Sequence, residues 1–325
     1  MSKIALIGAG RIGRIHARNA ALHPRLTLAA VVDPVAASAE SLAAEWNAPI
    51  RSLEDVLADG SIDGVIVASS TDTHLEYSVR AAQAGKAVFC EKPIDQDLQR
   101  ARSAADALKG ARLFLAFNRR FDPNFQALKA RLDEGSIGHI ESLQITSNDP
   151  APPPPSYVAV SGGLFKDMAI HDFDMARRLL GEEVCEVWAA GSCLVDPEIG
   201  KLGDVDTART VLKTGSGKLC VISNTRRSGY GYDQRVEAYA SAGMVRADNV
   251  LESTVQVFGE GGAGSDRLQN FFLDRYAEAY RREMDHFADI LAGATPSVGY
   301  ADGVAALALA EAATLSSKTG EVVTL

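Results

Sequence analysis

The sequence has 325 residues, which is long enough for about two domains that each bury a core. Hydrophobic residues make up 46% and charged residues 23%, a composition that excludes a globally disordered chain. The net charge of −9 argues against a partner with a phosphate backbone, so we expect no nucleic-acid binding. No run approaches the roughly 18–20 apolar residues of a membrane helix, and the first residues do not resemble a secretion signal. We therefore expect no membrane contact and a cytoplasmic location.

The first 120 residues alternate short β-branched runs with alanine-rich segments of helical character. Continuous apolar strands separated by helices predict a parallel sheet covered on both faces, as in a Rossmann domain. The expected strands are residues 3–8, 26–33, 64–69, 87–93 and 111–118. We assign residues 1–120 to this domain.

The pattern changes after residue 120, and we assign residues 121–325 to a second domain. Short strands with turn signals and no intervening helices predict a largely antiparallel sheet. The expected strands are residues 140–148, 184–195, 205–214, 218–227, 234–241, 243–249 and 253–259. A single helix is expected over 162–181, a glycine-rich loop over 259–267, and two alanine-rich helices after it. The four cysteines have no metal-ligand spacing, so we expect no metal site.

A glycine pattern, GAGRIG, follows the first strand and opens the first helix. In this position it is typical of a dinucleotide-binding loop. Gly8 would permit a tight turn, Gly10 the close approach of a pyrophosphate, and Gly13 the close packing of helix on sheet. Arg11 and Ile12 lie between the last two glycines and belong to the same predicted cofactor site.

The second strand ends at Asp33, twenty residues after Gly13. A carboxylate in this place accepts hydrogen bonds from a ribose 2′-hydroxyl and repels a 2′-phosphate, which predicts NAD rather than NADP as cofactor. The alternative is that Asp33 only starts an Asp-Pro turn.

Two further strand ends carry polar side chains. Ser69, Thr71 and His74 follow the third strand, and Glu91 and Lys92 end the fourth. Ligands of parallel sheets bind beyond the carboxyl ends of the strands, so we expect these residues beside the cofactor. Two alternatives are open: a Thr/Asp helix cap with a solvated histidine, and an exposed Glu-Lys pair.

Ionisable residues form a narrow stripe on the helix expected over 162–181. At about 100° per residue, Asp167, His171, Asp174 and Arg178 would fall within an arc of roughly 60°. The stripe is either the solvated side of a mostly buried helix or the lining of a site. Asp172 would point away from His171, so we do not expect it to act as a base.

Five motifs in both halves of the chain resemble the Gfo/Idh/MocA oxidoreductase family. They are GAGRIGRIHA, CEKP, NRRFDPNF, SGGLFKDMAIHDFDMARRLLG and YADGVAALALAEAA. The resemblance implies a Rossmann domain, a C-terminal α/β domain with a large, mostly antiparallel sheet, and a homo-oligomer, either a tetramer or a dimer. It also implies Lys92, Asp167 and His171 as catalytic residues, with Asp174 on the substrate side.

The implied activity is NAD-dependent oxidation of a secondary hydroxyl of a cyclic polyol, with myo-inositol, giving 2-keto-myo-inositol, as the leading substrate. Histidine has an ordinary pKa near neutrality, so His171 would accept the hydroxyl proton. Asp167 would orient the imidazole, and Lys92 would stabilise the developing negative charge. Other inositol isomers, a hexose and a non-catalytic NAD-binding regulator are the alternatives.

A polyol substrate also requires hydrogen-bonding groups for its other hydroxyls. We expect these from Asp174 and from Asn148, Asp149 and Tyr232. Tyr276 and Tyr280 are better explained as core residues at helical spacing. Arg226 and Arg227 are best explained as a solvated or interface strand end.

Overall fold

The computed structural model describes residues 1–325, which divide into two compact units. The first unit contains residues 1–121 and 279–307, and the second contains residues 122–278 and 308–325. The first crossing lies next to the boundary expected at residue 120, but the chain later returns to the first unit. The sequence places residues 279–307 with the second domain, whereas in the structure they belong to the first unit. The apolar face of a helix does not indicate which sheet it covers.

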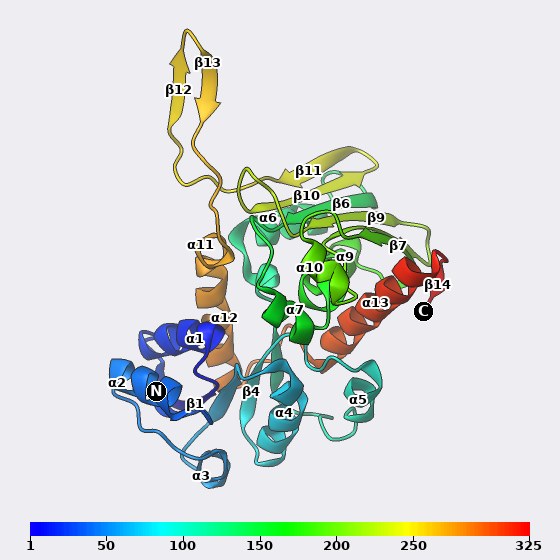
Figure 1. The fold of residues 1–325 in the computed structure, drawn as a ribbon. Coiled ribbons are helices and arrows are strands. Elements are labelled where there is room, and N and C mark those ends of the chain that lie inside the picture. The colour runs from blue at the N-terminus through cyan, green and yellow to red at the C-terminus, as the bar shows by residue number, and fades with distance from the viewer. The chain divides into compact units, whose positions relative to one another are not determined.

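The first unit contains a parallel five-stranded sheet of order β2-β1-β3-β4-β5, which confirms the expected Rossmann architecture (Figure 1). Its strands are β1 (Ser2–Ile7), β2 (Leu26–Val32), β3 (Gly64–Val67), β4 (Ala87–Glu91) and β5 (Leu113–Ala116). Its helices are α1 (Arg11–Ala21), α2 (Ala36–Trp46), α3 (Leu53–Ala58), η1 (Thr71–Thr73), α4 (His74–Gln83), α5 (Leu98–Ser103) and η2 (Asn118–Phe121), with most of α12 (Ala277–Leu291) and the start of α13 (Tyr300–Thr319).

Helices cover both faces of this parallel sheet. Phe89 of β4 contacts the rings of His16 on α1 and Phe287 on α12. The next residue, Cys90, points to the opposite face, toward Ser78 of α4. Alternate residues of a strand point to opposite faces, so the continuous apolar pattern of β4 follows from burial on both sides.

The second unit contains a seven-stranded sheet of order β11-β10-β6-β9-β8-β7-β14. All neighbours are antiparallel except β6 and β9, which confirms the expected mostly antiparallel sheet. Its strands are β6 (Ile140–Asn148), β7 (Val184–Ser192), β8 (Thr207–Thr214), β9 (Leu219–Thr225), β10 (Asp233–Ala240), β11 (Gly243–Ala247) and β14 (Val323–Thr324). Its helices are α6 (Pro123–Asp133), α7 (Pro155–Ser161), α8 (Leu164–Asp167), α9 (Ile170–Leu180), α10 (Pro197–Lys201), α11 (Phe272–Arg275) and the end of α13.

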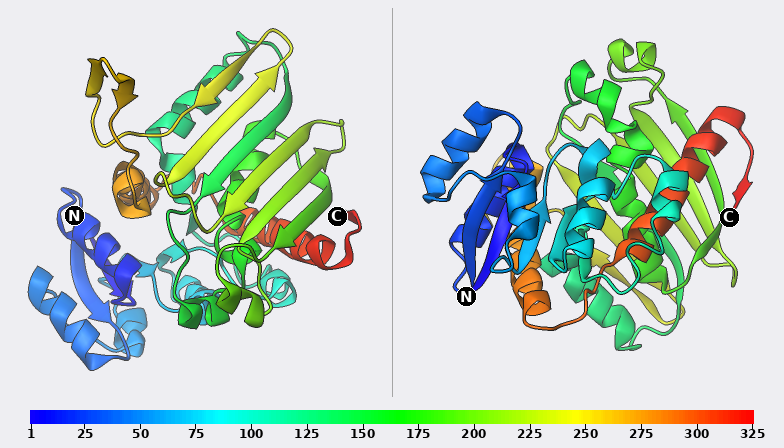
Figure 2. Two further views of the ribbon diagram at one scale, coloured as in Figure 1. Left: turned by 45° about the horizontal axis from the view of Figure 1, so that its top comes forward. Right: turned by 90° about the horizontal axis from the view of Figure 1, so that it is seen from below.

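Only one face of the seven-stranded sheet is covered. Along β7, Val187 and Ala189 are buried, whereas Trp188 between them is 39% exposed. Figure 2 shows helices, among them the red α13, against one face of this sheet. Ser316 near the end of α13 accepts a hydrogen bond from the Ala189 backbone N–H. The other face presents apolar side chains to its surroundings.

The glycine-rich segment expected as a loop over 259–267 is instead part of a hairpin. Strands β12 (Gln256–Gly259) and β13 (Gly262–Ser265) pair antiparallel around a two-residue turn. Figure 1 shows this hairpin extending away from the rest of the second unit. Gly262, the first residue after the turn, has φ +103°, a conformation that glycine adopts readily, and this turn chemistry accounts for the difference.

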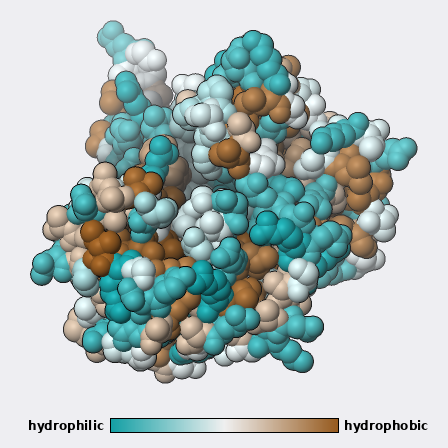
Figure 3. Space-filling view, turned by 60° about the horizontal axis from the view of Figure 1, so that its bottom comes forward, coloured by the Kyte–Doolittle hydropathy of each residue, from teal (hydrophilic) through white to brown (hydrophobic).

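None of the helices combines the length and apolar character required to cross a bilayer. On the face of the molecule in Figure 3, hydrophobic residues lie in small groups among hydrophilic ones. No group of three or more His, Cys, Asp or Glu side chains is arranged to hold a metal ion. All four cysteines are free, and Cys90 and Cys220 are buried.

Candidate functional site

The glycine loop between β1 and α1 depends on the absence of side chains. Gly8 has φ +103°, and a Cβ there would lie 2.4 Å from the carbonyl oxygen of Ala68. A Cβ on Gly13 would lie 1.9 Å from the Gly8 carbonyl oxygen. A Cβ on Gly10, in contrast, would meet nothing within 4 Å. Two glycines therefore permit the backbone packing, while the third borders open space.

The beginning of α1 is suited to an anion. Its N-cap residue, Gly10, makes no side-chain capping hydrogen bond, and the first turn contains no acidic residue. The first N–H groups of a helix have no partner within the helix, and they favour negative charge. The residues present therefore fit the pyrophosphate of a dinucleotide at this helix end.

Asp33 lies beside the glycine loop, directly after β2. Its Oδ2 atom accepts a hydrogen bond from the Ala9 backbone N–H at 2.6 Å, and its Oδ1 atom accepts one from Val35 at 2.8 Å. A carboxylate has about four acceptor positions, so these two bonds leave capacity for ribose hydroxyls. The Val35 bond agrees with the turn interpretation of Asp33, and the Ala9 bond ties the side chain to the loop.

The loop after β3 contains the expected residues, but His74 is not solvated. The Ser69 and Thr73 hydroxyls are 2.6 Å apart, and Thr71 begins the short helix η1. The His74 side chain is buried, with Nδ1 at 2.8 Å from the Pro93 carbonyl oxygen and Nε2 at 3.2 Å from that of Ser69. Burial lowers the pKa of His74. Its ring therefore links two strand ends, and direct contact of His74 with the cofactor stays a prediction.

The end of β4 differs from an exposed Glu-Lys pair. Glu91 is buried, and its Oε1 atom lies 2.6 Å from Nε2 of His16 on α1. Lys92 is half-buried, and its backbone N–H donates to Glu91 Oε2 at 3.3 Å. Burial alone would raise the pKa of Glu91, but the hydrogen bond and charge of His16 and the charge of Lys92 outweigh it, so the pKa is lowered. The strand end is thus attached to the helix that begins at the glycine loop.

In the second unit, the helix expected over 162–181 is two helices, α8 and α9. At the end of α8, the Ala169 N–H donates a hydrogen bond to the Leu164 carbonyl oxygen. At the start of α9, the Ala169 carbonyl oxygen accepts a hydrogen bond from the Phe173 N–H. Asp167 is the last residue of α8, and His171 lies in the first turn of α9. The single 60° arc calculated for a continuous helix is therefore wrong. No proline or glycine marks the break in the sequence.

Asp167 is held by two side chains from other elements. Both terminal nitrogens of Arg226 lie 3.3 Å from Asp167 Oδ2, and the Tyr157 hydroxyl donates to Oδ1 at 2.9 Å. Arg226 is only 1% exposed, so the expectation of a solvated strand end is wrong for this residue. Arg227 is exposed, as expected. Arg226 continues the alternation of buried residues at 220, 222 and 224. This alternation indicates that its side chain lies on the buried face of β9.

The other acidic residues of α9 are in the interior. Asp172 and Asp174 are both fully buried. Asp172 Oδ2 accepts a hydrogen bond from Asn224 of β9 at 2.8 Å, which gives it a structural partner. Contact of Asp174 with a substrate stays a prediction, because its side chain is enclosed by protein.

The remaining candidates lie around the start of β10. Asn148 ends β6 and donates to Asp233 at 3.4 Å, whereas Asp149 pairs through its backbone with Thr225 and Ser228. Tyr232 is buried against the ring of Tyr276 at 6.0 Å. The burial of Tyr276 and Tyr280 agrees with their interpretation as core residues.

Sequence reasoning missed Asp233, the centre of this polar group. The side chain is buried and accepts hydrogen bonds from Arg235 at 2.7 and 2.9 Å, from Tyr230 at 2.7 Å and from Asn249 at 2.7 Å. Asn148, which we expected to bind substrate, is another of its partners. The cluster satisfies a buried carboxylate with at least four side chains.

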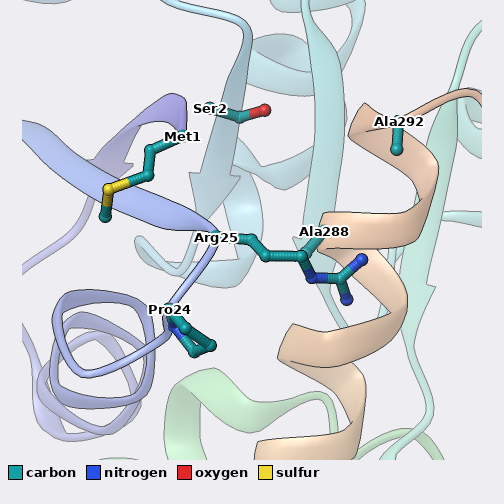
Figure 4. Close-up of a pocket in the computed structure, with 6 residues that line it drawn as sticks. All are labelled: Met1, Ser2, Pro24, Arg25, Ala288 and Ala292. Atoms are coloured by element: carbon teal, nitrogen blue, oxygen red, sulfur yellow. The ribbon is translucent and has the colours of Figure 1, made fainter.

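A hollow of about 340 Å³ lies in the first unit (Figure 4). Its lining consists of Met1, Ser2, Pro24, Arg25, Ala288 and Ala292. Figure 4 shows Arg25 extending toward α12, where it forms an ion pair with Asp289 at 2.6 Å. The hollow is at the amino ends of β1 and β2, whereas the glycine loop is at the carboxyl end of β1. It is therefore separate from the predicted cofactor site.

Comparisons with known proteins agree with this arrangement. Residues 2–118 match the model "Oxidoreductase family, NAD-binding Rossmann fold", and residues 125–246 match the GFO/IDH/MocA C-terminal domain. The chain is 45% identical to inositol 2-dehydrogenase of Rhizobium meliloti (97% of this chain, 96% of the relative) and 47% identical to myo-inositol 2-dehydrogenase of Thermotoga maritima (96% and 95%). The structure also resembles the crystal structure of scyllo-inositol dehydrogenase from Lactobacillus casei with bound NAD(H) and scyllo-inositol. The TM-score is 0.92 at 30% sequence identity, and the match covers 100% of this chain and 99% of that chain. The chain belongs to the Gfo/Idh/MocA family of NAD-binding oxidoreductases.

Proposed function

We propose that this protein is an NAD-dependent dehydrogenase that oxidises a secondary hydroxyl of an inositol, with myo-inositol as its principal substrate. The observation that carries the proposal is sequence identity of 45–47% over nearly the full length to inositol 2-dehydrogenases, in a chain that has Lys92, Asp167 and His171. The structural relative that binds scyllo-inositol is 30% identical, so scyllo-inositol is the second candidate.

The first unit would hold the cofactor through the groups described above. NAD, when bound, accepts a hydride from the carbon that carries the reacting hydroxyl. The uncapped start of α1 would bind the pyrophosphate, and Asp33 would accept hydrogen bonds from the adenosine ribose. Ser69 and Thr71 follow β3, at the same edge of the parallel sheet as the glycine loop.

Three side chains are proposed for the proton transfer. His171 would take the hydroxyl proton, since an imidazole near neutral pH is an efficient general base. Asp167 would orient that imidazole while Arg226 and Tyr157 hold its own carboxylate in place. The Lys92 ammonium would stabilise the negative charge that develops on the oxygen.

Two finer properties belong to the same proposal. The open apolar face of the seven-stranded sheet supports assembly of identical subunits as a dimer or tetramer, because exposed patches of this kind mark interaction surfaces. Light scattering of the purified protein would measure the subunit number, and a monomer at micromolar concentration would contradict the assembly.

We also propose that the protein is located in the cytoplasm.

NADH formation over a panel of polyols tests the activity. We expect the highest kcat/KM for myo-inositol, lower values for scyllo-inositol, and little turnover of hexoses. Lys92→Ala serves as the matched inactive control. Tight NAD binding without turnover of any inositol or sugar would contradict the enzyme proposal and favour a non-catalytic regulator.

The cofactor preference has its own test in Asp33→Ala. Removal of the carboxylate abolishes both its attraction for the ribose hydroxyls and its repulsion of a 2′-phosphate. We expect kcat/KM for NAD to fall by about 10-fold and the ratio of NADP to NAD use to rise. An unchanged ratio would show that Asp33 acts only on the Ala9 and Val35 backbone.

A further inference from the structure

A second group of ionisable side chains lies inside the first unit, on the sheet face covered by α1 and α12. It consists of His16 on α1, Glu91 at the end of β4, and Glu283 on α12. His16 and Glu283 are 0% exposed, and Glu91 is also buried. The first two are joined by the 2.6 Å contact described above. Glu283 has no assigned role in the chemistry proposed so far.

Aromatic contacts place Glu283 on the face of α12 that meets β4 and α1. Tyr280 and Phe287 are three residues before and four residues after Glu283, so all three lie on one side of the helix. The Tyr280 ring is 5.8 Å from that of His16, and the Phe287 ring is 5.6 Å from that of Phe89 on β4. Glu283 therefore lies between two rings that contact α1 and β4.

Glu91 points to the same side of β4. Phe89 and Glu91 are two residues apart on the strand, so their side chains share one face. That face contacts His16, which packs on Phe89 at 4.6 Å and binds Glu91. The Glu91 and Glu283 carboxyl groups thus enter the same interior region, one from the sheet and one from the helix.

The two carboxyl groups have opposite environments. Neither oxygen of Glu283 has a hydrogen-bond partner, and a buried carboxylate in that state is strongly disfavoured. Burial first, and then the negative charge of Glu91, raise the pKa of Glu283 well above its ordinary value. For Glu91, His16 and Lys92 reverse the effect of burial and lower the pKa. Two nearby carboxyls divide in this way when only one negative charge is stabilised.

The charged and titratable groups around the pair come from each neighbouring element. Glu91 is on β4, His16 on α1, and Tyr280 on the same helix as Glu283. Lys92, after β4, and His74, from α4, act on Glu91 through their charges. Glu91 is the group whose charge bears on Glu283.

We propose that Glu283 is a positioning residue that stays protonated and neutral. The only negative charge of the pair is then on Glu91, where His16 binds it. This contact fixes the end of β4 and therefore the position of Lys92. The proposal rests on the proposed function only in the role given to Lys92. His16 lies in α1, the helix whose start would bind the pyrophosphate, so the His16–Glu91 contact also connects the cofactor helix to the lysine.

Thermal unfolding tests the charge state without any turnover. Folding raises the pKa of the Glu283 carboxyl. Such a group destabilises the native state progressively as the pH rises above the ordinary carboxyl pKa of about 4.5. Glu283→Gln keeps the shape of the neutral acid and removes this penalty. We expect its Tm to exceed that of the wild type by about 3 °C or more at pH 8 and by less at pH 5. A difference that does not grow with pH would overturn the neutral state.

The matched control is Asp289→Asn, which removes an exposed carboxylate, paired with Arg25, from the same helix. We expect it to show no comparable pH-dependent gain in Tm. Infrared difference spectra provide a direct second measurement: wild type at pH 8 should show a carboxylic-acid C=O band that Glu283→Gln lacks. Absence of that band in the wild type would also overturn the proposal.

The positioning role is tested by the pH profile of kcat. In the wild type, ionisation of Glu283 at alkaline pH adds a second charge beside Glu91 and disturbs Lys92, whereas Glu283→Gln cannot ionise. We expect both proteins to have kcat within about 2-fold near neutral pH and the variant to keep its activity to higher pH. Identical alkaline profiles would overturn the positioning role. If the wild type oxidises no inositol but the unfolding and infrared results hold, the proposed function fails while the charge state of Glu283 stands.

Discussion

The glycine loop of the first unit and the Asp167 cluster of the second unit are built in opposite ways. The loop exposes backbone N–H groups at the start of α1 and depends on positions without a Cβ. The cluster consists of side chains: Asp167 is held by Arg226 from the end of β9 and by Tyr157 from α7. One region is therefore sensitive to an added methyl group, and the other to a lost charge or hydroxyl.

This difference has an energetic basis. A Cβ that would sit about 2 Å from a backbone carbonyl cannot be accommodated unless the chain moves, since the main chain of a tight turn has little freedom. A charged side chain, in contrast, tolerates small displacement but leaves a buried partner unpaired when it is removed. The two regions should therefore respond differently to conservative substitutions.

The largest effects are expected from the two side chains proposed to act on the reacting hydroxyl. Lys92→Ala, in the first unit, and His171→Ala, in the second, should each lower kcat by at least about 10²-fold through loss of electrostatic or acid–base assistance. Steady-state NADH formation from myo-inositol measures this. Unchanged thermal unfolding and NAD affinity are the controls. Near-normal turnover in either variant would contradict the role given to that residue.

The glycine loop is tested by a matched pair of alanine substitutions. Gly13→Ala places a Cβ 1.9 Å from the Gly8 carbonyl oxygen, so we expect the free energy of unfolding to fall by about 2–3 kcal/mol. Gly10→Ala meets nothing within 4 Å, so its stability should stay within about 0.5 kcal/mol while NAD affinity falls. Chemical denaturation and NAD titration separate the two. Equal stability losses would mean that Gly10 also has a packing role.

The features that the sequence predicted correctly depend on local backbone properties. The strands of the parallel sheet are continuous apolar runs because both of their faces are covered, and the glycines occur where φ or close packing excludes a Cβ. Neither property requires knowledge of distant residues. The order of the glycines after β1 was therefore sufficient to indicate the loop and the start of α1.

The features that the sequence did not predict depend on distant partners. Arg226 is buried because Asp167, 59 residues earlier, lies beside it, and the break before α9 has no proline or glycine to announce it. Residues 279–307 join the first unit through contacts such as that of Phe287 with Phe89. Alternation along β9 does indicate that Arg226 shares a face with Cys220 and Ile222, but an arginine on a buried face is unexpected until its partner is known.

The Asp167 cluster is tested with the adjacent arginines Arg226 and Arg227. Arg226→Lys keeps a positive charge but loses the planar group whose two nitrogens reach Asp167 Oδ2, so we expect kcat/KM for the polyol to fall by about 10-fold. Arg227→Lys changes an exposed residue and should have less than about a 2-fold effect. Steady-state kinetics on both variants measures the contrast. Equal activities would exclude a contribution of the Arg226–Asp167 pair to turnover.

The smallest effect concerns the loss of stability at acid pH. It compares the structural carboxylate of Asp233 with the proposed catalytic carboxylate of Asp167. Burial would raise the pKa of Asp233, but hydrogen bonds from Arg235, Asn249 and Tyr230 outweigh it and lower the pKa below the ordinary value of about 3.8. A carboxyl with a lowered pKa in the native state stabilises the fold fully at a pH above its ordinary pKa. This stabilisation is lost as the pH falls through the lowered pKa of the native state.

Asp233→Asn should therefore lower the free energy of unfolding by about 1 kcal/mol at pH 7, and the difference from the wild type should shrink as the pH falls below about 3.8. Urea denaturation over a pH series measures this. Turnover should change less than in Arg226→Lys, because the Asp233 cluster supports the start of β10 whereas Arg226 holds Asp167 directly. A greater loss of turnover than of stability would instead assign Asp233 to the substrate side, together with its partner Asn148.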